Sequence, residues 1–156
     1  MAQKITLTKE VEDLLKGRGL SKDDVAQVVD DVEATKKKFY LPKENKYLGK
    51  KIIGNVTAYT IYSPTTEKDV FAIHSAYGHK IRMKEPVRLI TEDVQEWECF
   101  TCKQKAVSGT IDMEYLGITR AAPGITCPNC KLSFIEEDIA TKTLVIAETL
   151  LEKKRA

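Results

Sequence analysis

The sequence predicts an α+β protein in which a helical hairpin packs on an antiparallel sheet, followed by a four-cysteine ribbon and a terminal helix. Three patterns indicate this fold. Apolar residues recur at helical spacing near the N-terminus, and from about residue 47 they alternate with polar residues. Two C-x-x-C units then lie in the C-terminal third. We expect a small α+β domain over residues 1–90 and a ribbon domain over residues 91–156.

The two predicted helices follow N-cap signals. Thr8 can cap a helix over residues 9–17, which the glycines at 17 and 19 end. Ser21 and the acidic residue three positions later predict a second helix over residues 22–36. This helix carries valines at helical spacing, at positions 25, 28, 29 and 32. We expect the pair to form a hairpin that covers one face of the sheet.

Strand signals follow the second helix. Gly54-Asn55 is a turn pair between two strand-like segments, and Gly78 predicts a turn between two more. Pro86 and mixed polarity suggest a linker over residues 84–95. The expected strands cover residues 4–7, 47–53, 56–62, 70–77 and 79–83.

The cysteines form the most specific motif in the chain. Cys99 and Cys102 make one C-x-x-C unit, Cys127 and Cys130 make another, and 24 residues separate the two units. Two such turns can direct four thiolates at one centre, an arrangement that suits tetrahedral zinc. The spacer carries a strand-like segment from Val107, a bend at Gly117 and a return strand, with Pro123-Gly124 expected to turn into the second unit. This is the layout of a zinc ribbon.

Iron and a reversible dithiol remain alternatives to zinc at these cysteines. Rubredoxin-type knuckles commonly carry glycine after the second cysteine, whereas this chain has Lys103 and Lys131 there. Together with Lys105, these lysines would offset the net charge of −2 that four thiolates leave on a divalent metal. Trp97 lies two residues before Cys99, which is a weak likeness to a thioredoxin active site.

A terminal helix is expected after the second cysteine pair. Ser133 and Glu136 have the spacing of a capping box, and a basic end from Lys153 to Arg155 suits the helix dipole. An apolar stripe follows the helix. Either it packs on the rest of the chain or it docks on a partner subunit. The stripe comprises Ile139, Ile146, Ala147, Leu150 and Leu151.

The two histidines are the other candidate functional residues. His74 and His79 could be hydrogen-bonded surface groups, or a turn at Gly78 could bring them together with Tyr77 and Arg82 in a small polar site. The chain contains no phosphate-binding glycine loop and no nucleophile with a base at a recognisable spacing. An independent enzyme activity is therefore not expected.

Charge and hydropathy limit the classes of partner and the cellular location that the sequence allows. The net charge is +2, with 17 basic against 12 acidic residues over 1–90 and 8 against 11 over 91–156. Neither segment predicts a nucleic-acid binder. No apolar stretch is long enough to cross a membrane and no signal peptide is visible, so we expect a cytoplasmic protein with reduced cysteines.

Several short motifs accompany the two cysteine pairs between Trp97 and Lys154. They are Glu114–Gly117, Phe134-Ile135-x-Glu137 and Leu150-Leu151-Glu152-x-Lys154. With these motifs the segment resembles a family of small double-C-x-x-C redox proteins of anaerobic bacteria, often encoded beside molybdenum-dependent aldehyde oxidoreductases. The N-terminal half carries Lys4–Leu7, Tyr47-Leu48, Gly54–Thr57 and His74-x-Ala76-Tyr77-x-His79. With these it is similar to a small uncharacterised domain found with redox enzymes of anaerobes.

The resemblance implies that the protein comes from an anaerobe and works within a multisubunit enzyme. One expectation is a zinc-binding, non-catalytic accessory subunit in a hetero-oligomer with a larger enzyme. That enzyme would be an oxidoreductase or an acyl-CoA enzyme of the thiolase type, since thiolases have small zinc-ribbon companions. The alternative expectation is a small redox protein that transfers electrons through cysteine-bound iron or a C-x-x-C dithiol.

Overall fold

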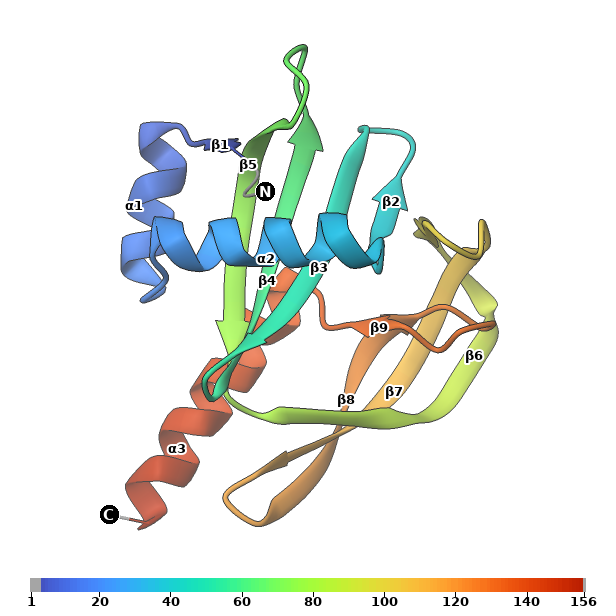
Figure 1. Cartoon of the computed structure of the whole chain (residues 1–156). Helices are drawn as coiled ribbons and strands as arrows, with labels where there is room; N and C mark the ends of the chain where they lie inside the picture. The colour runs from blue at the N-terminus through green and yellow to red at the C-terminus, as the bar shows by residue number, and fades with distance from the viewer. Residues whose placement is uncertain (1–3, 156) are drawn as a thin grey trace.

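The computed structural model describes residues 4–155, which form a mixed α+β fold with a C-terminal helix (Figure 1). The helical elements are Lys9–Gly17 (α1), Lys22–Thr35 (α2), a π-helical turn at Ile139–Leu144 (η1) and Val145–Arg155 (α3). The strands are Lys4–Thr6 (β1), Phe39–Leu41 (β2), Lys46–Ile53 (β3), Val56–Pro64 (β4), Val70–His79 (β5), Arg82–Cys99 (β6), Lys105–Tyr115 (β7), Ile118–Thr126 (β8) and Ser133–Phe134 (β9).

The strands pair in the order β1-β5-β4-β3-β2-β6-β7-β8-β9. Every pair is antiparallel except β1 with β5. The long strand β6 bends strongly where its register with β7 shifts, so β6 to β8 curve away from the plane of β3 to β5 (Figure 1). The short β2, which the sequence pattern did not reveal, connects the two parts by pairing with both β3 and β6.

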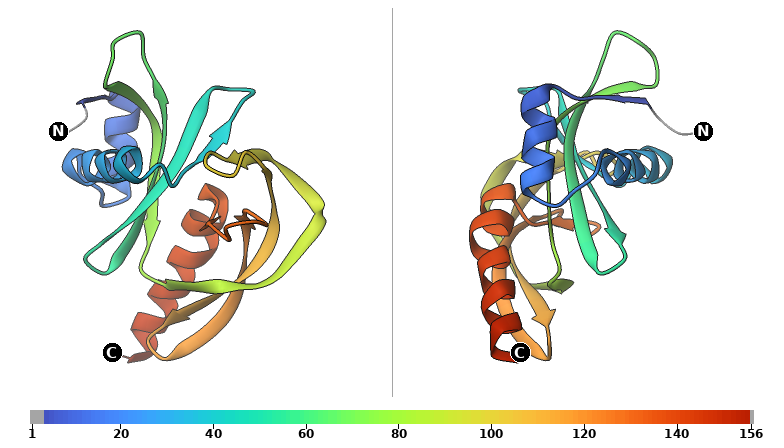
Figure 2. Two further views of the ribbon diagram at one scale, coloured as in Figure 1. Left: turned by 45° about the vertical axis from the view of Figure 1, so that its right-hand side comes forward. Right: turned by 90° about the vertical axis from the view of Figure 1, so that its left-hand side faces the viewer.

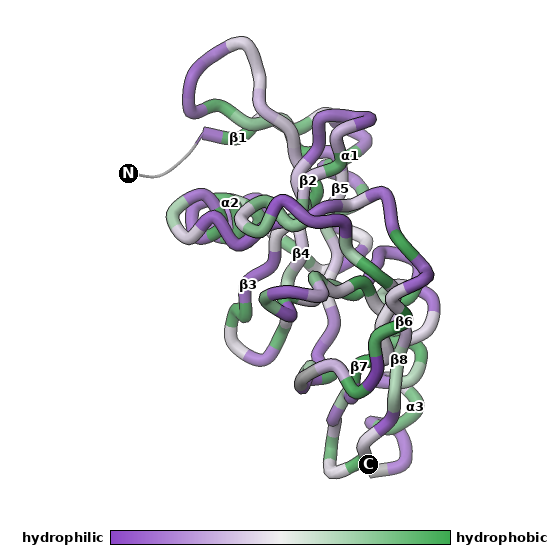
Figure 3. Tube along the Cα trace, turned by 90° about the vertical axis from the view of Figure 1, so that its right-hand side faces the viewer, coloured by the Kyte–Doolittle hydropathy of each residue, from purple (hydrophilic) through white to green (hydrophobic). Residues whose placement is uncertain are grey.

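Both N-terminal helices form where the sequence predicts them. Thr8 accepts a hydrogen bond from the Val11 amide, and Ser21 forms a complete capping box with Asp24. Hydrophobic and hydrophilic residues alternate along α2 (Figure 3), and its four valines are buried against the sheet. The expected helical hairpin is not shown, because α1 and α2 cross steeply instead of lying alongside each other (Figures 1 and 2).

The opposite face of β3 to β5 packs against the C-terminal part of the chain. Tyr59 and Tyr77 stack on this face with ring centroids 4.7 Å apart, and the Tyr77 hydroxyl donates to the Ile135 carbonyl at 2.7 Å. One hydrophobic cluster contains these tyrosines together with Phe134 and Ile111. The core therefore crosses the boundary that the sequence suggested near residue 90, and the two parts bury each other's apolar surface.

Four local expectations need correction. Residues 84–95 are not a linker but part of β6, because that segment pairs with β7. The turn expected at Gly78 is absent, since β5 continues to His79. Pro123-Gly124 lies inside β8 instead of turning, and Ser133 belongs to β9 rather than capping a helix. In each case long-range strand pairing determines the conformation and overrides the local signal.

The C-terminal helix is fixed to the body of the protein by a buried carboxylate. Glu148, 5% exposed, accepts the Lys80 amide at 3.0 Å on both oxygens. Ile139 and Ala147 pack on the core, whereas Ile146 and Leu150 are 58% and 55% exposed. The predicted apolar stripe is therefore divided between the core and the surface. None of the helices within residues 4–155 is long and apolar enough to span a membrane.

Candidate metal centre

Two tight turns bring the four cysteines together. The first turn joins β6 to β7 and carries Cys99 and Cys102; the second joins β8 to β9 and carries Cys127 and Cys130. The turns have the same backbone pattern. In each, the first cysteine donates its amide to the carbonyl five residues on, and its own carbonyl accepts the amide four residues on, at 2.8–2.9 Å. Antiparallel pairing of β7 with β8 places the turns side by side.

The four sulfur atoms fit a tetrahedral metal site. All lie within 4.8 Å of one another, and the Cys99 and Cys130 sulfurs are 3.7 Å apart. A zinc–sulfur bond of about 2.3 Å in a regular tetrahedron separates the sulfurs by about 3.8 Å. All four cysteines are free thiols. The residues predicted to bind metal are thus brought together, in a set that leaves no coordination position for substrate on a four-coordinate ion.

The lysines that replace glycine in the turns do not alter the backbone. Lys103 and Lys131 have φ of 58° and 67°, the left-handed conformation that glycine adopts most easily. For a non-glycine residue this conformation costs about 1–2 kcal/mol. The turns therefore retain knuckle geometry despite the sequence difference, so the lysines do not argue against iron as strongly as the sequence suggested.

Polar groups contact the sulfurs unequally. The Asn129 side-chain amide donates to the Cys102 sulfur at 3.2 Å, and this hydrogen bond lowers the pKa of Cys102 to about 7. Burial raises the pKa of the Cys127 thiol, while the Asn129 and Cys130 backbone amides oppose that shift. Hydrogen bonds of this kind stabilise thiolates and orient them toward a metal. Asn129 was not predicted from the sequence to contact a cysteine. The available signal was its position as a polar residue inside C-P-N-C.

A buried lysine connects the first turn to the N-terminal sheet. Lys38, 2% exposed, lies between the rings of Tyr47 and Phe100 at 3.7 and 4.5 Å and pairs with Glu33 at 2.7 Å. Its carbonyl accepts the Phe100 amide. No local sequence pattern distinguishes this lysine from a solvated one, because the pattern does not show that the first cysteine turn packs there.

The three lysines expected to neutralise the site have other contacts. Lys103 lies 4.3 Å from the centre of the Phe100 ring. Lys105 donates to the Glu96 carbonyl, and Lys131 donates to the Pro128 carbonyl at 2.7 Å. Each still places positive charge within the turns or next to them.

The histidines are not brought together. His74 is exposed and lies 2.7 Å from the Ser63 hydroxyl, with its pKa lowered by partial burial. His79 is buried between the Tyr59 hydroxyl and the Ile81 carbonyl, each at 2.7 Å. The polar site proposed for the pair depended on the absent turn at Gly78.

A family profile described as a domain of unknown function (DUF7479) matches residues 95–154. The match begins just before the first cysteine turn and extends into α3, so it includes all four cysteines. No curated protein and no solved structure matches the chain. The functional argument therefore depends on the geometry of the site.

Proposed function

We propose that this protein is a zinc-binding, non-catalytic accessory subunit of a larger cytoplasmic enzyme in anaerobic metabolism. The enzyme would be an oxidoreductase or an acyl-CoA enzyme of the thiolase type. The observation that carries the metal assignment is the cluster of four cysteine sulfurs within 4.8 Å. Two closed cysteine turns joined by a β-hairpin are typical of a zinc ribbon, whose metal stabilises structure and performs no chemistry.

The exposed face of α3 supports the accessory role. Val145, Ile146 and Leu150 are 41–58% exposed and lie on a helix whose other side already packs on the core. Exposed Lys153 and Lys154 follow them. A partner surface with an apolar centre and an acidic rim would complement this face.

The alternative is a redox protein using iron or a dithiol. It is favoured by the accessibility of two sulfurs, since Cys130 is exposed and Cys102 is partly exposed. Electron transfer and thiol exchange both require such access.

Elemental analysis and a visible spectrum of anaerobically purified protein separate the two proposals. One zinc per chain without visible absorption supports the structural site. Iron with visible charge-transfer bands, or a metal-free dithiol that oxidises reversibly, would refute it in favour of the redox protein.

The accessory role needs a separate test in the native host. Tagged wild-type protein is expected to copurify with one enzyme whose activity falls when the chain is removed. Ile146→Lys with Leu150→Lys should abolish that association, whereas Val87→Lys, an exposed position on β6, should leave it intact. Normal enzyme activity without the chain would contradict the proposal.

A further inference from the structure

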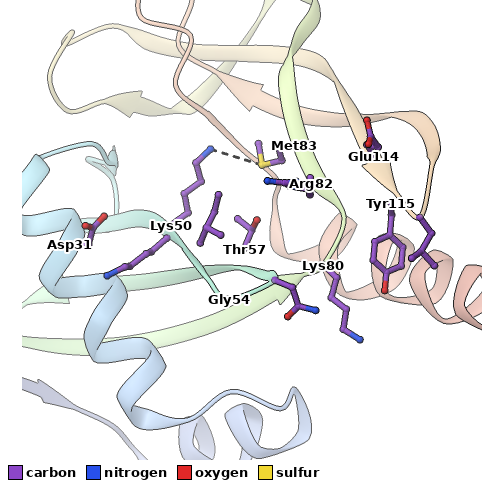
Figure 4. Close-up of a pocket in the computed structure, with 13 residues that line it drawn as sticks. Asp31, Lys50, Gly54, Thr57, Lys80, Arg82, Met83, Glu114 and Tyr115 are labelled. Atoms are coloured by element: carbon purple, nitrogen blue, oxygen red, sulfur yellow. Dashed lines mark hydrogen bonds between the residues drawn. The ribbon is translucent and has the colours of Figure 1, made fainter.

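Two adjoining cavities, one of which reaches the cysteine cluster, have a local excess of basic side chains. A cavity of about 790 Å³ lies between the β3–β4 turn and the β7–β8 turn (Figure 4), and a second of about 660 Å³ reaches the second cysteine turn. Lys50 and Met83 line both. Together the cavities are lined by seven basic and two acidic side chains, although the net charge of the chain is only +2.

Lys50 lies where the two cavities meet. Its ammonium group donates to the Ser133 carbonyl, lies 4.0 Å from the Met83 sulfur and 5.0 Å from the centre of the Phe134 ring. Figure 4 shows the side chain extending to Met83, with Arg82 beside it. An ammonium group has three donors, and a carbonyl with a weak thioether contact satisfies at most two.

No carboxylate forms an ion pair with Lys50 among the side chains that the structure describes. A desolvated cation without an anion is unfavourable, and burial accordingly lowers the pKa of Lys50 to about 8. Lys38, which is 2% exposed, has a carboxylate partner in Glu33. Lys50 therefore lacks the counter-ion that the same protein supplies elsewhere.

We infer that the cavities at Lys50 bind an organic phosphate, with the phosphate group between Lys50 and Arg82 and the organic portion between the β3–β4 and β7–β8 turns. Arg82 is exposed, and no carboxylate lies within ion-pair distance of it among the described residues. Glu114, which interacts with Arg82 electrostatically, forms its ion pair with Lys84, so the Arg82 guanidinium can bind a phosphate. Lys37 and Lys131 extend the positive surface on the side of the cysteine turn.

The larger cavity suits the organic portion of such a ligand. Ile52, Met83 and Tyr115 line it, and its volume lies in the range of small-molecule sites. Asp31 and Glu114 also line it, and Glu114 already pairs with Lys84 at 2.6 Å. This mixed lining, in which apolar side chains lie beside the charged ones, favours a phosphorylated metabolite over inorganic phosphate alone.

Calorimetry and amide NMR on the metal-loaded full chain test the inference. The probes are inorganic phosphate, pyrophosphate, ADP and acetate. Pyrophosphate and ADP are expected to shift the amides of Lys50, Met83 and Ser133, with ADP binding more tightly than pyrophosphate and acetate binding far more weakly. Because no step involves the metal, the result does not depend on whether the ion is zinc or iron.

The matched variants are Lys50→Met and Lys68→Met, which remove the same charge from the cavity and from an exposed loop. Lys50→Met should weaken ADP binding about tenfold to hundredfold, the range for losing a charged hydrogen bond, and Lys68→Met should leave it unchanged. Arg82→Gln, at an exposed position that the fold does not require, should weaken binding severalfold.

Several results would overturn the inference. They are the absence of saturable binding at millimolar concentrations, equal loss in Lys50→Met and Lys68→Met, or acetate binding as tightly as phosphate. Pyrophosphate binding as tightly as ADP would overturn the assignment of the larger cavity to an organic group. An amide spectrum of each variant that matches the wild type outside the cavities confirms that binding, not folding, has changed.

Discussion

Replacing His79 with glutamine is expected to change how stability depends on pH. His79 is 2% exposed, and both ring nitrogens have partners 2.7 Å away. The Ile81 carbonyl can only accept, so Nδ1 carries the proton and Nε2 accepts from the Tyr59 hydroxyl. A second proton would place a positive charge in this buried site, and the charge of Lys50 opposes it further.

Burial, with the Lys50 charge, lowers the pKa of His79 from 6.5 to about 4 despite the opposing hydrogen bond to Ile81. The unfolded chain takes up a proton near pH 6.5, whereas the folded chain does so near pH 4. Stability from the neutral ring is complete above pH 6.5 and is lost as the pH falls to 4. At 1.36 kcal/mol for each pKa unit, the loss is about 3 kcal/mol.

Urea unfolding of metal-loaded protein between pH 7 and pH 4 measures this loss. Subtracting the free energy of unfolding of His79→Gln from that of the wild type at each pH removes the contributions that both proteins share, including protonation of the cysteines. His74→Gln is the matched control, because His74 is exposed and bonds only to a hydroxyl. With two histidines in the chain, NMR can follow each ring directly. A His79 ring that titrates near pH 6.5, or parallel stability curves for wild type and His79→Gln, would refute the reasoning.

Three further predictions concern packing and the metal centre. Gly124→Ala should destabilise the protein by about 1–3 kcal/mol in denaturant unfolding, because a Cβ there would lie 2.4 Å from Ile111 Cδ1 and 2.9 Å from the Phe134 carbonyl; an unchanged midpoint would contradict the close packing of β8. Lys38→Met should cost about 1–3 kcal/mol, because Glu33 would lose its 2.7 Å ion pair and keep only the Tyr62 hydroxyl and the exposed Lys36, and adding Glu33→Gln should restore part of the loss. Lys103→Gly should raise the free energy of unfolding by up to about 1 kcal/mol, because glycine relieves the left-handed backbone at φ 58°, and a decrease would indicate that the contact with Phe100 matters more.

The cluster of four cysteines was largely predictable from the sequence because its signal is local. A C-x-x-C turn fixes two sulfurs within a few residues, and the β-hairpin signal between the pairs suffices to bring the turns together. The helices α1 and α2 were equally predictable from the sequence, since caps and helical periodicity act within one or two turns.

The surroundings of the site were not predictable in this way. Lys38 and Lys50 are lysines in a chain with 25 basic residues, and nothing near them in sequence distinguishes them from solvated ones. Their environments depend on contacts with Phe100 and Ser133, more than 60 residues away. The turn expected at Gly78 failed for the same reason, since pairing with β4 extends β5 through that glycine.

The sequence by itself determined the cluster of four cysteines, the two N-terminal helices and most of the strands, because caps, turns and alternation are properties of neighbouring residues. Only the tertiary structure decided how the parts meet. It shows one core shared across residue 90, a bent β6 in place of a linker, and, where the parts join, a half-buried lysine that has no carboxylate partner within the described side chains. These features arise from burial between distant segments, and burial is a property of the folded chain that no local pattern encodes.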